Sequence, residues 1–161
     1  MRWSGASILG RPLPFEVLHV TEYLAKLKRE GKLKLKPFKG SMTYHDPCQV
    51  SRRGGAAWAA RQILEGFAED FREMKPTGNN NWCCGGGGGV QAMECASDLR
   101  HQVFKIKIAQ VEETGADQLV SACANCRLTM DESRKALGWD HEIMSLLEVI
   151  ADHIDEAEAS A

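Results

Sequence analysis

The stretch that decides the fold is Gln118-Leu-Val-Ser-Ala-Cys-Ala-Asn-Cys126, a short apolar run that leads into two cysteines. Residues 118–121 have the length and character of a buried strand, and a helical pattern follows the cysteines. A second strand pattern, Ser41-Met-Thr-Tyr-His45, ends at Pro47 just before Cys48, because proline disfavours helical backbone in the residue before it. Cysteines therefore follow two predicted strands directly.

Strand and helix patterns alternate along the rest of the chain. Thr21 is the expected N-cap of a helix that Gly31 stops. Gly115 is the expected C-cap of a longer helix that starts at Val90. Strands are expected at residues 16–20, 41–45, 118–121 and 142–144, and helices at 21–31, 90–114 and 124–137, with further apolar helix faces at Ala60, Ile63, Leu64 and Phe67 and at Ile143, Leu147, Ile150 and Ile154.

This alternation predicts the fold class. Strands that alternate with helices of ten or more residues are typical of βαβ units. We therefore expect an α/β fold, a Rossmann-like open parallel sheet with helices on both faces. Within the helix expected at 90–114, Cys95 lies on an apolar face with Leu99 and Ile106, so we expect it to be a small hydrophobic core residue.

The composition excludes several classes of function. The chain has 161 residues and a formal net charge of −2, whereas a dedicated nucleic-acid binder usually carries a basic excess. No apolar run approaches the roughly 18 residues that a membrane span needs, and the N-terminus lacks the apolar stretch of a signal peptide. We therefore expect a cytoplasmic protein with no nucleic-acid partner and no direct membrane span. In that setting, six cysteines indicate metal or redox chemistry.

Five of the six cysteines fall into three groups with regular spacing. There are 34 residues between Cys48 and the adjacent pair Cys83-Cys84. There are 38 residues between that pair and the third group, Cys123 and Cys126. These spacings match the length of a βαβ repeat, and the loops after parallel strands meet at one edge of the sheet. The glycine run Gly85–Gly89 lets backbone approach a bulky ligand and aim N–H groups at sulfur. We therefore expect one site.

The number and spacing of the cysteines narrow the choice of ligand. Structural zinc takes four ligands, an adjacent pair forms at best a strained disulfide, and an ordinary cubane cluster typically uses a compact C-x₂-C-x₂-C run. Five ligands with one adjacent pair favour an iron–sulfur cluster of unusual shape. A zinc-stabilised interaction domain and a cluster-free dithiol oxidoreductase that uses Cys123 and Cys126 are the alternatives.

Three motifs together resemble a known family, the cysteine-rich CCG domain. They are His45-Asp-Pro-Cys48, Cys83-Cys-Gly-Gly-Gly-Gly-Gly89 and Cys123-Ala-Asn-Cys126. That family includes the catalytic subunit of heterodisulfide reductase, the iron–sulfur subunit of glycolate oxidase, and the K subunit of the membrane complex linked to dissimilatory sulfite reductase. Residues 15–24 and 43–53 look most like the K subunit. The second cysteine spacing is slightly longer than the family pattern.

The resemblance implies a cofactor and a chemistry. It implies a noncubane [4Fe–4S] cluster at which a disulfide or persulfide sulfur is reduced or formed, as in a heterodisulfide-reductase-like oxidoreductase of sulfur metabolism. The substrate would be a small sulfur-carrier protein or a low-molecular-weight disulfide. The partners would be a ferredoxin-like cluster domain and subunits of a membrane complex, docked on its cytoplasmic side. The implied ligands are Cys48, Cys83, Cys84, Cys123 and Cys126, with Gly85, Gly86, Gly87 and His45 in contact with the cluster.

The resemblance also sets the expected domain boundaries. Residues 15–155 would form the cysteine-rich domain, residues 1–14 an irregular lead-in interrupted by Gly10 and two prolines, and residues 156–161 a flexible acidic tail. Related proteins normally carry a ferredoxin-like segment with two cubane clusters upstream, and its cysteines are absent here. The chain is therefore expected to be a separate subunit or the C-terminal part of a longer protein.

Other residues near the motifs have two interpretations each. His45 either donates to cluster sulfur or is an ordinary hydrogen-bonded histidine at a strand end. Arg52 and Arg53 either attract an anionic substrate or lie in a solvated loop. Trp82 either shields the cluster from water or only packs. The seven basic residues between Lys26 and Lys39 form a solvated surface or dock an acidic partner.

Overall fold

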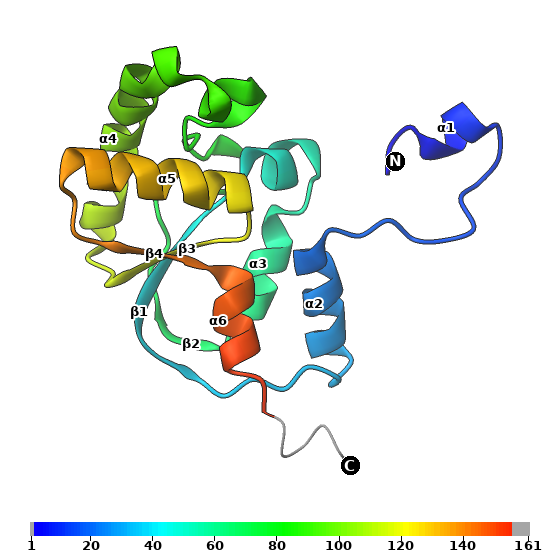
Figure 1. Cartoon of the computed structure of the whole chain (residues 1–161). Helices are drawn as coiled ribbons and strands as arrows, with labels where there is room; N and C mark the ends of the chain where they lie inside the picture. Colours follow the sequence, from blue (N-terminus) through cyan, green and yellow to red (C-terminus); the bar gives the residue numbers. More distant parts are fainter. Residues whose placement is uncertain (1, 156–161) are drawn as a thin grey trace.

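A four-stranded parallel sheet forms the centre of the protein (Figure 1). The computed structural model describes residues 2–155, so the tail expected at 156–161 lies outside the described residues. Every neighbouring pair of strands is parallel, which confirms the predicted α/β class. The strands are β1 (Phe38–His45), β2 (Ala68–Phe71), β3 (Gln118–Ser121) and β4 (Glu142–Ser145), in the spatial order β2-β1-β3-β4.

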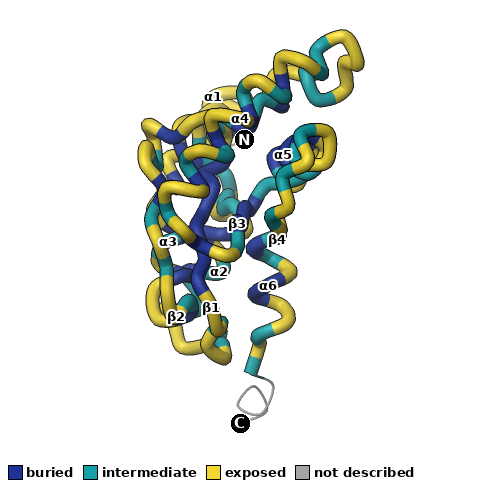
Figure 2. Tube along the Cα trace, turned by 90° about the vertical axis from the view of Figure 1, so that its left-hand side faces the viewer, coloured by how far each residue is buried: buried dark blue, intermediate teal, exposed yellow. Residues whose placement is uncertain are grey.

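Helices cover both faces of this sheet, as expected. Two groups of helices cover the sheet, one group on each face. Because successive residues of β3 point to opposite faces, Val120 packs against the first group and Leu119 packs against the second. Figure 2 shows the buried stretches along β1 and β3. No helix within residues 2–155 combines the length and apolar character needed to cross a bilayer. The first group is α2 (Val20–Arg29), α3 (Ala57–Leu64) and α6 (Leu146–Asp152), and the second is α4 (Ser97–Thr114) and α5 (Ala124–Leu137).

The connections place a reversal of strand order beside the cysteines. From β1 the chain runs through α3 to β2 at one edge, then returns through α4 to β3 on the other side of β1. It continues through α5 to β4 at the opposite edge. In open α/β sheets, the crevice at such a reversal, outside the carboxyl ends of the strands, is where ligands bind.

The N-terminal region differs from expectation in two places. Residues 16–20 do not form the expected strand; instead His19, not Thr21, caps α2. The ring of His19 accepts a hydrogen bond from the Thr21 N–H, and the Glu22 carboxylate accepts one from the His19 N–H at 2.9 Å. The expected irregular lead-in contains a short helix, α1 (Gly5–Leu9). The neighbouring Arg2 ties this segment to Glu22 through two hydrogen bonds of 2.6 and 2.7 Å.

The helix expected from Val90 is shorter than predicted. Two 3₁₀ segments, Gly87–Ala92 and Glu94–Ala96, precede α4, which begins only at Ser97. Cys95 is therefore out of phase with the helix and is exposed, so its assignment to the core is wrong. Leu99 and Ile106, also expected on the packed face, are 59% and 44% exposed. The residues of α4 that are buried are Arg100, Phe104, Lys107 and Val111.

Candidate metal centre

The carboxyl ends of β1 and β3 bring two of the cysteine loops together. His45, the last residue of β1, pairs with Ser121, the last residue of β3. Cys48 follows His45 closely in the chain, and Cys123 follows Ser121 closely. Both loops therefore border the crevice at the reversal of strand order.

A pocket of about 370 Å³ lies between these loops and the glycine run. Four of the five cysteines predicted as ligands line it, namely Cys48, Cys84, Cys123 and Cys126. The fifth, Cys83, directly precedes Cys84 in the chain. Gly86 and Gly87 are part of the wall, whereas Gly85 is not. The structure thus gathers three groups, far apart in sequence, around one space. The lining residues are Pro47, Cys48, Gln49, Cys84, Gly86, Gly87, Gly88, Gly89, Gln91, Ala92, Cys123, Asn125 and Cys126.

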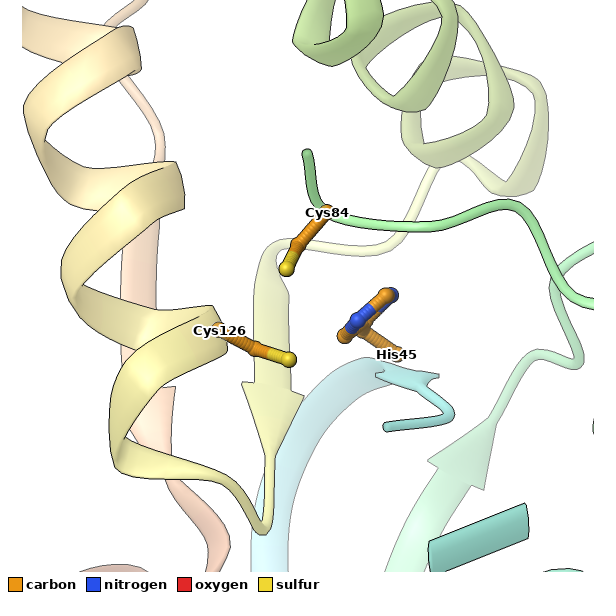
Figure 3. Close-up of side chains that lie close together, drawn as sticks. All are labelled: His45, Cys84 and Cys126. Carbon is orange, nitrogen blue, oxygen red and sulfur yellow. The ribbon is translucent and has the colours of Figure 1, made fainter. Parts of the chain in front are cut away.

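Three buried side chains converge at the base of the site. Figure 3 shows His45, Cys84 and Cys126 pointing toward one another, and their ligand atoms all lie within 4.8 Å of each other. Within the described residues, neither ring nitrogen of His45 has a hydrogen-bond partner of normal geometry. Burial lowers the pKa of His45, and the Cys84 thiol opposes that shift. A buried imidazole without partners is unfavourable, so this ring suits a site in which a bound group supplies the missing contact.

Cys84 is the cysteine whose surroundings most favour a thiolate. The thiols of Cys126 and Cys83 hydrogen-bond to it and lower its pKa far below the usual value, although burial acts against them. His45 and the backbone N–H of Gly86 also favour its charged form. The pKa of Cys126 is raised because that thiol donates to Cys123 and Cys84. Thiolate is the form that binds metal ions and attacks sulfur.

Cys123 occupies the N-cap of α5, and Cys126 lies in the first turn of that helix. The Cys126 thiol lowers the pKa of Cys123 to about 6, and the backbone N–H groups of Cys126 and Asn125 act in the same direction. These N–H groups are free at a helix start and point toward negative charge. The placement of this pair at the start of a helix agrees with the sequence pattern.

The positions after Cys84 differ in whether, and why, they require glycine. The N–H of Gly85 donates to Cys83 Sγ at 3.4 Å, and Gly85 has φ of +95°, which disfavours other residues. A methyl group at Gly86 would overlap the hydroxyl of Thr129. A methyl group at Gly87 would meet nothing within 4 Å. Close packing therefore requires glycine at 86 but not at 87.

An ion-pair network beneath Cys48 was not predicted from the sequence. The guanidinium of Arg61 donates to Asp46 at 2.7 and 2.9 Å and to Glu73 at 2.8 Å. Asp46 also accepts from the Gly78 N–H at 2.7 Å and from Ser51 at 3.2 Å. Asp46 therefore links the end of β1, helix α3 and the loop that leads to Cys83. A carboxylate beside the Pro-Cys motif was visible in the sequence, but its partner Arg61 was not.

A buried lysine behind the cysteines was also missed. Lys107 on α4 has no exposed surface, and its Nζ donates to Gln110 Oε1 at 2.7 Å and contacts Met74 Sδ at 3.2 Å. Burial lowers its pKa to about 8, while Asp46 and then Cys84 favour its charged form. The helical spacing of Lys107 from Phe104 and Val111 could have indicated its burial, but lysine is rarely buried.

The arginines and the tryptophan near the motifs have structural contacts. Arg52 donates to the carbonyl oxygen of Asn79 at 2.7 Å and to that of Asn81, so it holds the loop before Cys83. The Trp82 indole donates to the Val103 carbonyl at 3.2 Å, although the side chain is 39% exposed. Neither residue lines the cysteine pocket.

Several members of the basic run have partners within the chain. Lys28 donates to the carbonyl oxygens of Gln62 and Ile63, each at 2.9 Å, at the C-terminus of α3. Lys26 pairs with Glu16 at 3.2 Å. These contacts favour a structural role over a docking surface for this part of the run.

The chemistry of the donor set suits an iron–sulfur cluster. Four thiols from three loops line one pocket, the Cys83 thiol hydrogen-bonds to one of them, Cys84, and iron–sulfur clusters are bound by cysteine thiolates. The backbone N–H groups of Gly85 and Gly86 are directed at cysteine sulfur, and hydrogen bonds to sulfur tune such clusters. The residues present therefore fit the group that the sequence suggested.

Comparison with known proteins agrees with this chemistry. The pattern of the family described as the cysteine-rich domain, CCG, matches residues 42–131, more than half of the chain. One subunit of the dihydromethanophenazine:CoB–CoM heterodisulfide reductase from Methanosarcina barkeri is 37% identical over 90% of this chain and 36% of its own length. A probable membrane-anchored ferredoxin from Chromohalobacter salexigens is 30% identical over 76% of this chain and 18% of its own.

One subunit of the fumarate reductase (CoM/CoB) from Methanothermobacter marburgensis is 32% identical over 83% of this chain and 26% of its own length. The chain thus spans about a third or less of the length of these relatives. The likeness to the K subunit of the sulfite-reductase-linked complex stays a prediction. The relatives support an iron–sulfur redox role. From its motifs and from the matched residues, the chain belongs to the cysteine-rich CCG domain family.

Proposed function

We propose that this domain is an iron–sulfur thiol–disulfide oxidoreductase module. Cys48, Cys83, Cys84, Cys123 and Cys126 would bind a noncubane [4Fe–4S] cluster, and the substrate would be a disulfide or persulfide sulfur. The observation that carries the proposal is the convergence of four of these cysteines, from three loops, on one pocket at the carboxyl ends of β1 and β3, with the fifth, Cys83, hydrogen-bonded to Cys84. His45, buried beside Cys84 and without a hydrogen bond of normal geometry among the described residues, supports it.

The residues of the chain prepare the site for this reaction. Reducing a disulfide to two thiols consumes two electrons and two protons, and the bound cluster would pass the electrons one at a time. The N–H groups of Gly85 and Gly86 and the start of α5 stabilise negative charge on the ligand sulfurs. The Asp46–Arg61 network fixes the loops that carry Cys48 and Cys83.

A second cavity supports an anionic sulfur substrate. It measures about 650 Å³ and shares Gln49 and Cys123 with the cysteine pocket. Much of its wall is apolar, and Arg2 and Arg53 also line it. A substrate held there would meet the site at Cys123, with its negative end near a guanidinium. Of the two arginines predicted to attract a substrate, Arg53 is the one in a suitable place.

The relatives support the proposed partners. They are named as subunits of oxidoreductases or as a membrane-anchored ferredoxin, and each is longer than this chain. We therefore infer that the electrons come from a ferredoxin-like cluster domain and that the module works with subunits of a membrane complex, on its cytoplasmic side. The substrate would be a small sulfur-carrier protein or a low-molecular-weight disulfide.

Anaerobic reconstitution with iron and sulfide tests the function. We expect about four iron and four sulfide per chain, visible absorption, and a paramagnetic signal from the oxidised, thiol-treated protein by electron spin resonance. C48S and C84S should lose the absorption. C95S is the matched control and should keep it, because Cys95 is exposed and outside the pocket. Zinc in place of iron and sulfide would contradict the proposal.

A cluster-free dithiol reaction is the second candidate. The observation in its favour is the pair Cys123 and Cys126, in which one thiol has its pKa lowered to about 6 and the other has it raised. If this pair acted alone, C48S would retain disulfide reductase activity. Under the proposed function, C48S loses the cluster and the activity together.

A further inference from the structure

The ammonium group of Lys107 is buried without a carboxylate beside it. Within residues 2–155, its polar contacts are the Gln110 amide oxygen at 2.7 Å and the Met74 thioether at 3.2 Å, both uncharged. Removing a charge from water costs free energy that neutral partners repay only in part. If this lysine only filled space, an apolar residue could replace it with no loss in the free energy of unfolding. The position therefore calls for negative charge close by.

The cysteine site is one source of that negative charge. Met74, which contacts Lys107, packs in one buried cluster with Cys84 and Cys126. Burial opposes the charged form of Lys107, and negative charge on Cys84, Cys83 and Cys126 favours it, after a larger contribution from Asp46. Asp46 acts in the same direction, but its carboxylate is already bound by Arg61 at 2.7 and 2.9 Å.

Lys107 is not placed to touch a substrate. Its side chain is fully buried, and it lines neither the cysteine pocket nor the larger cavity beside it. Its contacts come from α4 itself and from Met74, behind the cysteines. Any effect on the reaction must therefore pass through the cysteines and what they hold.

We propose that Lys107 is a positioning residue for charge, whose ammonium offsets the negative charge of the cysteine thiolates and raises the reduction potential of the cluster they bind. The inference rests on the function proposed above. Five thiolate ligands give such a centre excess negative charge, and net charge and burial are among the quantities that set its potential. A cation in a poorly solvated interior acts strongly on a nearby redox group, because little water screens it.

The test compares variants at two lysines of α4 after anaerobic cluster loading. Midpoint potentials are measured by redox titration, followed by visible absorption and electron spin resonance. K107M and K107Q remove the charge and should lower the equilibrium constant for reduction about tenfold, which is a shift of about 59 mV for one electron. K107R keeps the charge and should restore most of the wild-type potential. K105M is the matched control, since Lys105 is exposed on the same helix and solvent screens its charge.

Several outcomes would overturn the inference. They are an unchanged potential in K107M, an equal shift in K107R, or an equal shift in K105M. If K107M folds but holds no cluster, the inference stands only when K107R holds one, and loss of loading in both means that shape rather than charge is required. In the empty protein, K107M should unfold at a temperature no lower than wild type; a lower temperature with an unchanged potential indicates a packing role. A wild-type protein that binds no iron refutes the proposed function first.

Discussion

At residue 86 the chain passes so close to α5 that a side chain does not fit. A methyl group on Gly86 would overlap the Thr129 hydroxyl and press on the Asn125 amide, whose nitrogen would be 3.1 Å away. Thr129 is fully buried and cannot move aside freely. We expect G86A to lower the free energy of unfolding of the empty protein by roughly 1–3 kcal/mol, measured by urea denaturation. It should also reduce cluster loading, because the Gly86 N–H supports the Cys84 thiolate.

The neighbouring glycine supplies the control for that prediction. Gly87 lines the same pocket, but a methyl group there meets nothing within 4 Å, and its φ is not positive. G87A should therefore change the free energy of unfolding by less than about 1 kcal/mol, in the stabilising direction if at all. Equal losses in G86A and G87A would mean that the run is needed for flexibility rather than for close packing.

Individual residues also show what the sequence could and could not predict. The cysteine groups were placed at one edge of a sheet because cysteines follow predicted strands and because the spacing of the groups matches the length of a βαβ repeat. Arg61 and Lys107 were not found, because a charged residue in a helical pattern is normally solvent-facing. Their inward orientation depends on partners distant in sequence, such as Asp46 and Met74, and no local pattern identifies those.

For helix α4, the sequence predicted the location of the helix but the wrong packed face. The apolar residues suggested that the side with Leu99 and Ile106 packs inward, yet these side chains are 59% and 44% exposed. The two 3₁₀ segments before Ser97 interrupt the predicted helix, so the residues before Ser97 do not continue the helical periodicity of α4. The packed side contains two basic residues, Arg100 and Lys107, which lowers its apparent hydrophobicity. Because these two basic residues lie on the packed side, the sequence of α4 does not show a clear amphipathic pattern.

This orientation of α4 predicts unequal effects of two truncations. Phe104 is fully buried and meets the Trp139 ring with centroids 5.7 Å apart, so F104A should lower the free energy of unfolding by about 3–5 kcal/mol. I106A removes a side chain that is 44% exposed and should cost less than about 1 kcal/mol. Urea denaturation of the two empty variants measures both. A larger loss in I106A would support the face that the sequence suggested.

For the whole molecule, the fold class was predictable and the order of the strands was not. Alternating strand and helix patterns indicated a parallel sheet with helices on both faces, because each pattern has its own period. The short edge strand β2 was missed, since Ala68-Glu-Asp-Phe71 is only partly buried and contains two acids. Without β2, the reversal of strand order between β1 and β3 could not be seen. That reversal explains why Cys48 and Cys123 share one site.

The proposed ligands join the two central strands to the loop before α4, and this gives a prediction for the entire fold. A group bound at the site links the ends of β1 and β3 and the segment with Cys83, and it stabilises the folded state by mass action. A group present at about a thousand times its dissociation constant contributes about 4 kcal/mol, or roughly 8–16 °C in unfolding temperature for a chain of this size. We expect anaerobic loading to raise the unfolding temperature by this amount, and removal of the cluster by chelator and oxidant to reverse it. C95S should gain as much as wild type, whereas C84S should gain little. Equal unfolding temperatures for loaded and empty wild-type protein would contradict this prediction, because they would mean that the group binds the folded chain no more tightly than the unfolded chain.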